Sequence, residues 1–537
     1  MNSKDKISYL ILGLILILGI WVIYPSLFSL LPDFAVEDEM VVVQAFYRAF
    51  ARDFSNYSFF KYPGLLYLLL FPGYYLVYLI FNFHSLIHLK ALEDLKIFLA
   101  RPWLSEAGAV LLGRCLSLFL GLLSVWLFFE IFKNRAGKKV SLIGALVIIS
   151  SPSWLFCSSL LKNDTLLIFC LLFTLWASFG ILEKGERKYY LLSGLGTGLC
   201  ISAKLNFFSL ILPLSAHWLR LRGERKFIKI FGDKNLIIGM FLALGIFVLT
   251  NPFQTFQVSR AIEGMKLELA LMRGAQNILQ ASSQLWHHSP FFFQFLCTLP
   301  LAMGILGFIM GLLGIIFLFR QFSRQEFYLF ISYPLFYFLS WMIFSRQGYP
   351  HYYLPLVIFL ALGVGGFFKW LSLKARWTEM IGILLIFISV FFNFNLAREL
   401  NQAESKIVKE SFEWLARHLP KKEELVIFFP YRPLRESDYL LRYKFYPQFF
   451  LRPDWLKQTR PKNLLLQEFY YFAFLNNPEA RNPSFEGFIY LQEPDSGYHL
   501  TRRWQKRLFW AKIYQYAFPD LRHISIGLYQ LTSLPSP

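Results

Sequence analysis

Residues 7–39 read ISYLILGLILILGIWVIYPSLFSLLPDFAVEDE, a long apolar run that ends in an acidic cluster. Its first part, residues 7–32, has no charged residue and exceeds the ~20 apolar residues that a helix needs to cross a bilayer. Two lysines precede it, and it is too long for a cleaved signal peptide. It is therefore predicted to be a membrane anchor with its N-terminus inside. Three acids, Glu37, Asp38 and Glu39, follow at its outer end.

Composition places the whole chain among polytopic membrane proteins. Of its 537 residues, 56% are hydrophobic and only 16% are charged, with a mean hydropathy of +0.45. A soluble protein would carry ~25% charged residues. The net charge of +20 does not require a nucleic-acid partner, because basic residues of membrane proteins collect in cytoplasmic loops. All five cysteines lie in apolar segments without the spacing of a disulfide framework or a zinc site.

Further apolar runs are long enough to be spans, and the loops between them show where lysine and arginine accumulate. The runs lie at about 107–131, 140–158, 165–182, 235–250, 292–319, 327–345, 352–368 and 380–396. The densely basic loops are Lys133–Lys139, Lys184–Lys188, Arg220–Lys234, Arg320–Arg324 and Lys369–Arg376. Because basic loops stay on the cytoplasmic side, all of them are predicted to lie inside.

The charge rule also decides two ambiguous stretches. Residues 188–220 are mostly apolar with basic flanks, so they are predicted to cross twice, as two short helices that meet at Lys204. Residues 63–83 look like a span, but a crossing there would move every later basic loop outside. They are therefore predicted to form an interfacial or re-entrant helix within one long outer loop, residues 33–106, which leaves eleven spans.

After residue 396 the composition becomes that of a soluble domain. Residues 405–419 have the pattern of an amphipathic helix. Strands are predicted at 425–429, 488–491 and 524–531. The predicted fold is an α-helical polytopic membrane protein with about eleven transmembrane helices in residues 1–396, followed by an extracytoplasmic α/β domain in residues 397–537.

Short motifs spread over residues 30–430 carry a family resemblance. They are Asp38-Glu39, Lys61-Tyr62-Pro63-Gly64, Gly113-Arg114, Ser151-Pro152 with Asp164, Gly194 to Lys204, Asn251-Pro252-Phe253, Arg346 to Pro355, and Trp414 to Pro420. In this order they resemble GT-C glycosyltransferases of the protein O-mannosyltransferase and lipid A aminoarabinose-transferase type. Gly64 departs from the pattern, since the family's Pro-Pro-Leu element has its second proline there, and this predicts a looser donor-binding turn.

The resemblance implies a GT-C fold and an activity. Enzymes of this type take sugar from a polyprenyl phosphate at the outer face of the membrane, so the chain is predicted to be an integral-membrane glycosyltransferase. Its partners would be the polyprenyl-phosphate sugar, the bilayer and an acceptor; a protein hydroxyl, a glycolipid and a cell-envelope polysaccharide all fit. Two other classes stay open, a multi-pass transporter and a non-catalytic scaffold of envelope assembly.

The chemistry of such a transfer needs a base at the attacking hydroxyl. Asp38 and Glu39 are adjacent, so on a helix their side chains diverge by about 100° and would not share one role. The resemblance matches Asp38 to the family's first acid and makes it the predicted base, with Glu39 orienting the acceptor or supporting Asp38. One base and one direct displacement predict inversion at the sugar carbon.

The same reaction needs positive charge around the departing phosphate. The candidates are Lys61, to which the resemblance gives phosphate contact, Lys204 in its apolar surroundings, Arg346 and Arg114. For Arg114, pairing with an acid such as Glu106 or Asp164 is the favoured alternative.

Candidates for contacts to the sugar or donor are Asp164, at an outer turn, and His351 and Tyr352, in the loop that Arg346 opens. Asp164 has three candidate partners: the sugar, a metal or a basic residue. The chain has no Asp-x-Asp motif, and the sequence therefore assigns no metal ligands while leaving a divalent cofactor open.

Overall fold

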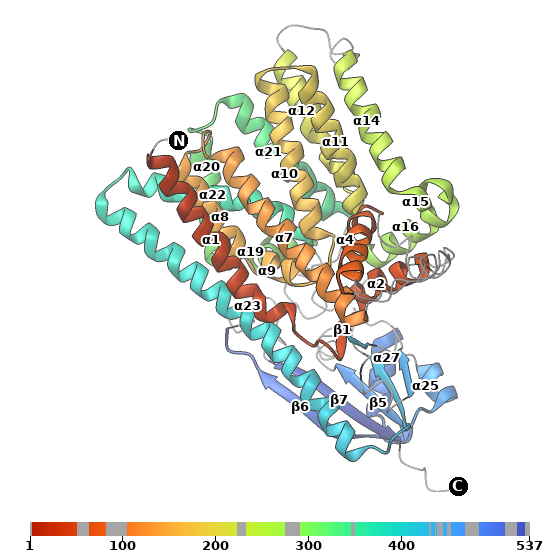
Figure 1. The fold of residues 1–537 in the computed structure, drawn as a ribbon. Helices are drawn as coiled ribbons and strands as arrows, with labels where there is room; N and C mark the ends of the chain where they lie inside the picture. Colours follow the sequence, from red (N-terminus) through yellow and green to blue (C-terminus); the bar gives the residue numbers. More distant parts are fainter. Residues whose placement is uncertain are drawn as a thin grey trace.

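The computed structural model describes most of the chain. The described residues are 3–50, 64–81, 105–222, 232–273, 290–344, 350–428, 431–434, 437, 444–447, 453–467, 483–510 and 523–531. They form a bundle of apolar helices with a smaller domain at one end of it, built around a sheet (Figure 1). One large cluster of buried apolar side chains forms the core of the bundle.

Within the described residues, five helical segments are apolar and long enough to cross a membrane. They belong to α1 (Ser3–Leu27), α7 (Glu106–Phe132), α10 (Asp164–Glu183), α22 (Leu354–Ser372) and α23 (Arg376–His418). Shorter apolar helices are α4 (Leu65–Phe81), η1 with α12 (Phe207–Leu210 and Ile211–Leu221) and α14 (Lys234–Thr250). Other helices of the bundle include α2 (Glu37–Phe50), α11 (Arg187–Lys204), α15 (Pro252–Phe256), α16 (Val258–Arg273), α21 (Arg324–Phe344) and η3 (Pro350–Tyr353). The chain is a multi-pass membrane protein.

Two predicted spans are bent in the structure. In the first, α8 (Lys138–Ser150) and α9 (Pro152–Ser159) meet at 61°. Ser151 caps α9 and Pro152 opens it, which ends α8 and starts a new helix. In the second, α20 (Ile305–Leu318) meets the preceding segment at 108°. That segment comprises α18 (Pro290–Phe293), η2 (Gln294–Thr298) and α19 (Leu299–Met303). The bend is at Gly304, whose φ of 88° suits glycine.

The predicted pair of helices in residues 188–220 is confirmed, because α11 ends at Lys204. Leu205 ends the helix with a left-handed φ of 49°. The glycines that precede Lys204 serve packing: a Cβ on Gly194 would lie 2.2 Å from the carbonyl oxygen of Gly239 in α14. Only glycine at position 194 lets α11 and α14 approach this closely.

The basic loops meet at one end of the bundle, which we call the basic end. Arg135 pairs with Glu183 and, at 3.6 Å, with Glu326. The other contacts join Lys138 to Asp5, Lys139 to Glu379, Gln325 to the carbonyl oxygen of Leu219, and Lys369 to Gln321. These contacts place the loops at the same end of the bundle as the N-terminus, as predicted; which side of the membrane this end faces stays a prediction.

The other end of the bundle carries the C-terminal domain (Figure 1). Its five-stranded sheet has the order β4-β2-β5-β7-β6, in which β4, β2 and β5 are parallel and β7 and β6 antiparallel. The strands are β2 (Glu424–Phe428), β4 (Lys444–Pro447), β5 (Asn463–Gln467), β6 (Tyr498–Arg507) and β7 (His523–Leu531), and the helices are α25 (Pro453–Thr459), α27 (Pro483–Gln492) and the short η5 (Pro494–Ser496). The predicted strands at 425–429 and 524–531 are confirmed.

The predicted strand at 488–491 is wrong, because these residues lie in α27. Phe488 and Leu491 are three positions apart, so they lie on one face of the helix. Both are fully buried in the cluster that contains Val426 and Leu464 of the sheet. A short apolar run does not distinguish a strand from one buried helix face.

Two connections tie the domain to the bundle. Helix α23 is continuous from Arg376 to His418, so the predicted boundary at residue 396 falls within one helix, and the predicted amphipathic helix at 405–419 is its last part. The second connection is β1 (Phe34–Val36), which pairs antiparallel with β3 (Tyr431–Pro433). Beside it, Asp33 accepts hydrogen bonds from the backbone of Leu434 and from the hydroxyl of Ser437.

Candidate active site

Helix α2 begins at the acidic motif, and Glu39 fixes its first turn. Strand β1 ends at Val36, and the Glu39 carboxylate accepts a hydrogen bond from the Val36 backbone N–H at 3.1 Å. A glutamate at the third helical position that reaches back in this way caps the helix N-terminus. Asp38 lies in the same turn, and its side chain is outside the described residues. The structure thus holds the backbone of the predicted base in place.

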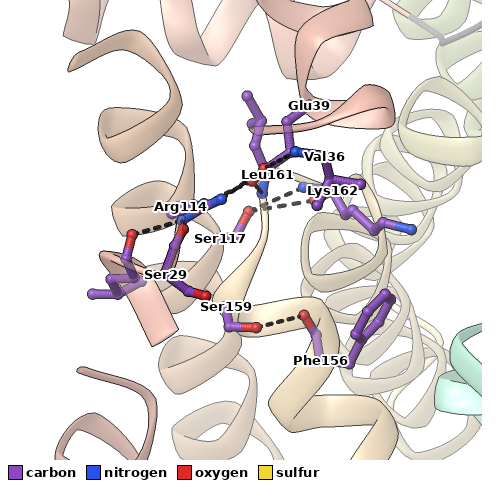
Figure 2. Close-up of polar contacts among 10 residues, drawn as sticks. Ser29, Val36, Glu39, Arg114, Ser117, Phe156, Ser159, Leu161 and Lys162 are labelled. Carbon is purple, nitrogen blue, oxygen red and sulfur yellow. Dashed lines mark hydrogen bonds and ion pairs between the residues drawn. The ribbon is translucent and has the colours of Figure 1, made fainter. Parts of the chain in front are cut away.

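Glu39 also forms a buried ion pair with Arg114 of α7 (Figure 2). The Arg114 Nε and Nη2 atoms donate to the two carboxylate oxygens, each at 2.8 Å, and the two side chains are 1% and 0% exposed. The Leu161 backbone N–H donates to the same carboxylate at 2.9 Å. Bidentate guanidinium–carboxylate pairs are strong and geometrically specific.

The other nitrogen of Arg114 binds the end of the first span. Its Nη1 atom donates to the carbonyl oxygens of Leu27 and Ser29, at 2.8 and 2.9 Å. Gly113 allows Leu161 to approach α7, because a Cβ at residue 113 would lie 2.5 Å from the Leu161 side chain. Arg114 therefore joins the end of α1, the start of α2 and the turn before α10.

These contacts change the roles of two predicted site residues. Arg114 is engaged by Glu39 and by two backbone carbonyls, which does not fit its predicted contact with the donor phosphate. The alternative prediction, that Arg114 pairs with an acid, holds, but the acid is Glu39 rather than Glu106 or Asp164. Both oxygens of Glu39 are occupied, so Glu39 is suited to support the turn that carries Asp38 and not to bind an acceptor.

Asp164 and Lys204 form a second ion pair, at the ends of α10 and α11. Lys204 Nζ donates to Asp164 Oδ1. Asp164 is buried at the first position of α10, whereas the Lys204 side chain is 28% exposed. The side chain of Asn163 ties the two turns together by donating to the Ala203 carbonyl oxygen at 2.9 Å. A buried carboxylate thus holds the lysine, and part of the lysine side chain stays exposed.

Aromatic residues surround this pair. Lys204 Nζ lies 4.6 Å from the centre of the Tyr352 ring, a cation–π contact. The His351 ring lies 4.4 Å from that of Tyr352 and 5.8 Å from that of Phe156. Lys162 Nζ also lies over the Phe156 ring, 4.9 Å from its centre. The structure therefore brings together Asp164, Lys204, His351 and Tyr352, all of them predicted site residues.

The turn at residues 160–164 links the two ion pairs. Its Leu161 backbone binds Glu39, and its last residue, Asp164, binds Lys204. Ser117 of α7 holds the turn at Lys162, donating to the backbone carbonyl at 3.5 Å and accepting from the backbone N–H at 3.4 Å (Figure 2). Two lysines and one carboxylate on this turn and its neighbour leave a surplus of positive charge, which suits an anionic ligand.

Two predicted phosphate-binding residues, Lys61 and Arg346, lie outside the described residues. Gly64, three positions after Lys61, is described, and its backbone N–H donates to Asn251 Oδ1 at 2.6 Å. A Cβ on residue 64 would lie 2.1 Å from the Thr250 carbonyl oxygen. Glycine at this position thus permits a close contact with the end of α14, while the rest of the predicted donor-binding turn, residues 61–63, lies outside the described residues.

The comparisons with known proteins agree with this architecture. The family model described as dolichyl-phosphate-mannose-protein mannosyltransferase matches residues 106–250, a range that includes Arg114, Asp164 and Lys204. No curated protein matches the sequence. Among solved structures, ArnT from Cupriavidus metallidurans bound to undecaprenyl phosphate is 12% identical, with a TM-score of 0.50 and 100% of both chains covered.

A second solved structure is similar, the oligosaccharyltransferase of Archaeoglobus fulgidus in complex with Zn and sulfate. It is 13% identical, with a TM-score of 0.50, and the similarity covers 89% of this chain and 70% of that one. Both proteins are GT-C superfamily members. The chain has the GT-C fold. The predicted class, a helical membrane protein with a GT-C fold and a C-terminal sheet, is confirmed, and the predicted number of eleven spans stays a prediction.

The structure adds residues to the site that the sequence analysis did not predict. Lys162 and Phe156 complete the surroundings of Asp164, and Ser202 of α11 receives a hydrogen bond from Asn251. Lys162 could have been predicted from its place in the turn at residues 162–164, beside Asp164. No local feature of the sequence predicts the role of Phe156. Within the described parts of the chain, no group of three His, Cys, Asp or Glu residues could hold a metal ion.

Proposed function

We propose that the protein is an inverting glycosyltransferase that moves a sugar from a polyprenyl-phosphate donor to an acceptor on the extracytoplasmic side of the membrane. The observation that carries the proposal is the cationic site around Asp164. It lies at the end of the spanning helices, on the same turn that holds the start of α2 and so the Asp38 backbone. A lipid phosphate in the membrane interface would reach such a site.

The orientation follows from the charge rule. The basic end holds the N-terminus and the lysine- and arginine-rich loops, which stay in the cytoplasm. The opposite end, with the Asp164–Lys204 pair and the C-terminal domain, is then extracytoplasmic. A polyprenyl-phosphate sugar would present its headgroup at this face.

In the proposed step the acceptor hydroxyl attacks the anomeric carbon of the sugar. Asp38 accepts the hydroxyl proton, the new carbon–oxygen bond forms, and the bond between the carbon and the phosphate oxygen breaks. The electron pair leaves with the polyprenyl phosphate. Lys204, together with Lys61 and Arg346 from their loops, stabilises that negative charge. Attack from the face opposite the phosphate inverts the configuration at the sugar carbon.

Support for the donor class comes from the ArnT structure, which is bound to undecaprenyl phosphate. His351 and Tyr352, in contact with Lys204, would bind the headgroup or sugar. An aromatic ring beside a sugar-binding site can pack against the apolar face of the sugar. The acceptor is a protein hydroxyl, a glycolipid or an envelope polysaccharide.

A transfer assay tests the proposal. Purified protein is incubated with a panel of radiolabelled polyprenyl-phosphate sugars and with membrane extract, and the labelled product is identified. Transfer of label by the wild type but not by the Asp38→Asn variant supports the enzyme. If no donor gives a labelled product although the protein is folded and monodisperse, the scaffold or transporter alternative replaces it.

A further inference from the structure

The C-terminal domain contacts α23 within the part of that helix that spans the membrane, before the helix reaches the membrane surface. Between Glu379 and Arg398 the helix has no charged residue, and these 18 positions match the ~20 needed to span the hydrocarbon core. Arg398 thus marks the membrane boundary on the side of the domain. Along the spanning part, Phe387 and Phe391 are 66% and 51% exposed, as expected of side chains that face lipid.

Residues just after strand β6 lie against this lipid-facing surface. The Trp510 ring packs edge-on against Phe391 and Phe392, with centroid distances of 5.7 and 5.6 Å. Phe391 precedes Arg398 by seven positions, which on a helix is about 10 Å toward the membrane centre. The Trp510 side chain therefore reaches below the boundary that Arg398 marks.

One side chain, that of Glu399, accepts the backbone hydrogen bonds of residues 509 and 510. The N–H groups of Phe509 and Trp510 both donate to the Glu399 carboxylate, the second at 2.8 Å. Irregular backbone is tolerated near the hydrocarbon region only when its polar groups find protein partners. Side chains on a helix tilt toward its N-terminus, so Glu399 reaches toward the membrane to meet them.

The Phe509 side chain continues the apolar surface of α23. It is 65% exposed and lies edge-on to Trp510, with ring centroids 5.3 Å apart. Arg507 and Arg398 are both exposed nearby, one on β6 and one on α23. Aromatic residues next to arginines are typical of the boundary between lipid tails and headgroups.

We propose that Phe509 and Trp510 form a membrane anchor of the C-terminal domain. The two rings insert into the bilayer interface beside α23, Glu399 satisfies their backbone, and Arg398 and Arg507 bind the phosphates of anionic phospholipid headgroups. The occupant of this surface is the bilayer, because the surface is continuous with the lipid-facing side of α23. The anchor holds the domain against the end of the bundle independently of any catalytic activity.

Site-directed spin labelling in nanodiscs of mixed zwitterionic and anionic phospholipids tests the anchor. Phe509→Cys is labelled in a Cys115→Ser background, since the other four cysteines are buried. The control is Thr501→Cys, which is exposed on β6, six positions or about 20 Å from the end of that strand at Arg507. We expect the spin label at 509 to be inaccessible to a water-soluble nickel complex but accessible to oxygen, which dissolves in the bilayer. The label at 501 should be accessible to both.

Two further samples test the depth of the anchor and the role of Glu399, and the dependence on protein concentration distinguishes the bilayer from a second protein chain. Arg507→Cys, also exposed, should show protection from nickel that is weaker than at 509. Glu399→Ala should restore nickel accessibility at 509, because two backbone N–H groups lose their partner. Equal nickel accessibility at 509 and 501 in nanodiscs would overturn the proposal. Protection at 509 that depends on protein concentration would also overturn it, since it would assign the surface to a second protein chain.

Discussion

The carboxylate of Glu39 and the guanidinium of Arg114 meet 75 positions apart in the chain, as a bidentate pair from which solvent is excluded. Burying two charges costs more than burying apolar groups of the same size, so such pairs serve specificity as often as stability. Here the pair fixes where α2 begins relative to α1 and α7. The turn that carries Asp38 is thus set by charges that do not themselves react.

The first prediction concerns this pair. Arg114→Ala leaves the Glu39 carboxylate buried without its partner, so the free energy of unfolding should fall by ~3–5 kcal/mol. Thermal denaturation of the purified protein in detergent measures the loss. The control is Glu410→Ala, which removes the exposed partner of Lys406 on α23 and should cost less than ~1 kcal/mol. Equal melting temperatures for Arg114→Ala and wild type would contradict the structural role.

The second prediction concerns the base. Asp38→Asn keeps the size of the side chain but cannot accept a proton, so turnover should fall by ~10²–10⁴-fold while donor binding survives. The measurement is the transfer assay with the donor that labels a product. Glu37→Gln, a change in the same turn, is the matched control and should leave turnover unchanged. Near-normal turnover of Asp38→Asn would remove the base from this position.

Charge patterns in the sequence predicted much of this architecture. Lysine and arginine are costly inside a membrane and are sorted to one side, so the basic loops predicted the basic end, where Arg135, Glu183 and Glu326 meet. Lys204 similarly predicted a helix end inside an apolar stretch. In both cases the energy involved is large and depends on local sequence alone.

The partners of the buried charges were not predictable. Arg114 had several acids within reach of its helix, and the choice of Glu39 depends on how β1 and α2 pack against α7, which no local pattern records. The same holds for Gly64, whose close neighbour is a backbone carbonyl of α14, far away in the sequence. Phe488 and Leu491 show the corresponding limit in the soluble domain, where two apolar residues fit a strand or a helix.

The third prediction concerns topology. Reporter proteins fused after Lys90 and after Leu419 should both be active on the outer side, and one fused after Arg222 should be active inside. A crossing by residues 63–83 would move both of these fusions inside and the Arg222 fusion outside, because it adds one span before all three. That result would disprove the eleven-span arrangement, and so would opposite locations for the Lys90 and Leu419 fusions, which would mean an odd number of spans between them.

The last prediction separates the structural and donor-binding roles of Lys204. Lys204→Met keeps the apolar stem but leaves the buried Asp164 carboxylate without its ion-pair partner, so the melting temperature should fall. Adding Asp164→Asn removes the stranded charge, and the double variant should regain most of that stability. Asp164→Asn alone is the fourth member of the double-mutant cycle, and the interaction energy from the cycle measures the pair itself.

Affinity for the donor should not recover with stability in the same variants. If Lys204 binds the lipid phosphate, affinity for the polyprenyl donor weakens by ~1.5–3 kcal/mol in Lys204→Met, the value of a hydrogen bond to a charged group. It stays weak in the double variant, although stability returns, because the cation is still missing. Affinity that recovers together with stability would assign Lys204 to the scaffold and leave Lys61 and Arg346 as the donor's cationic partners.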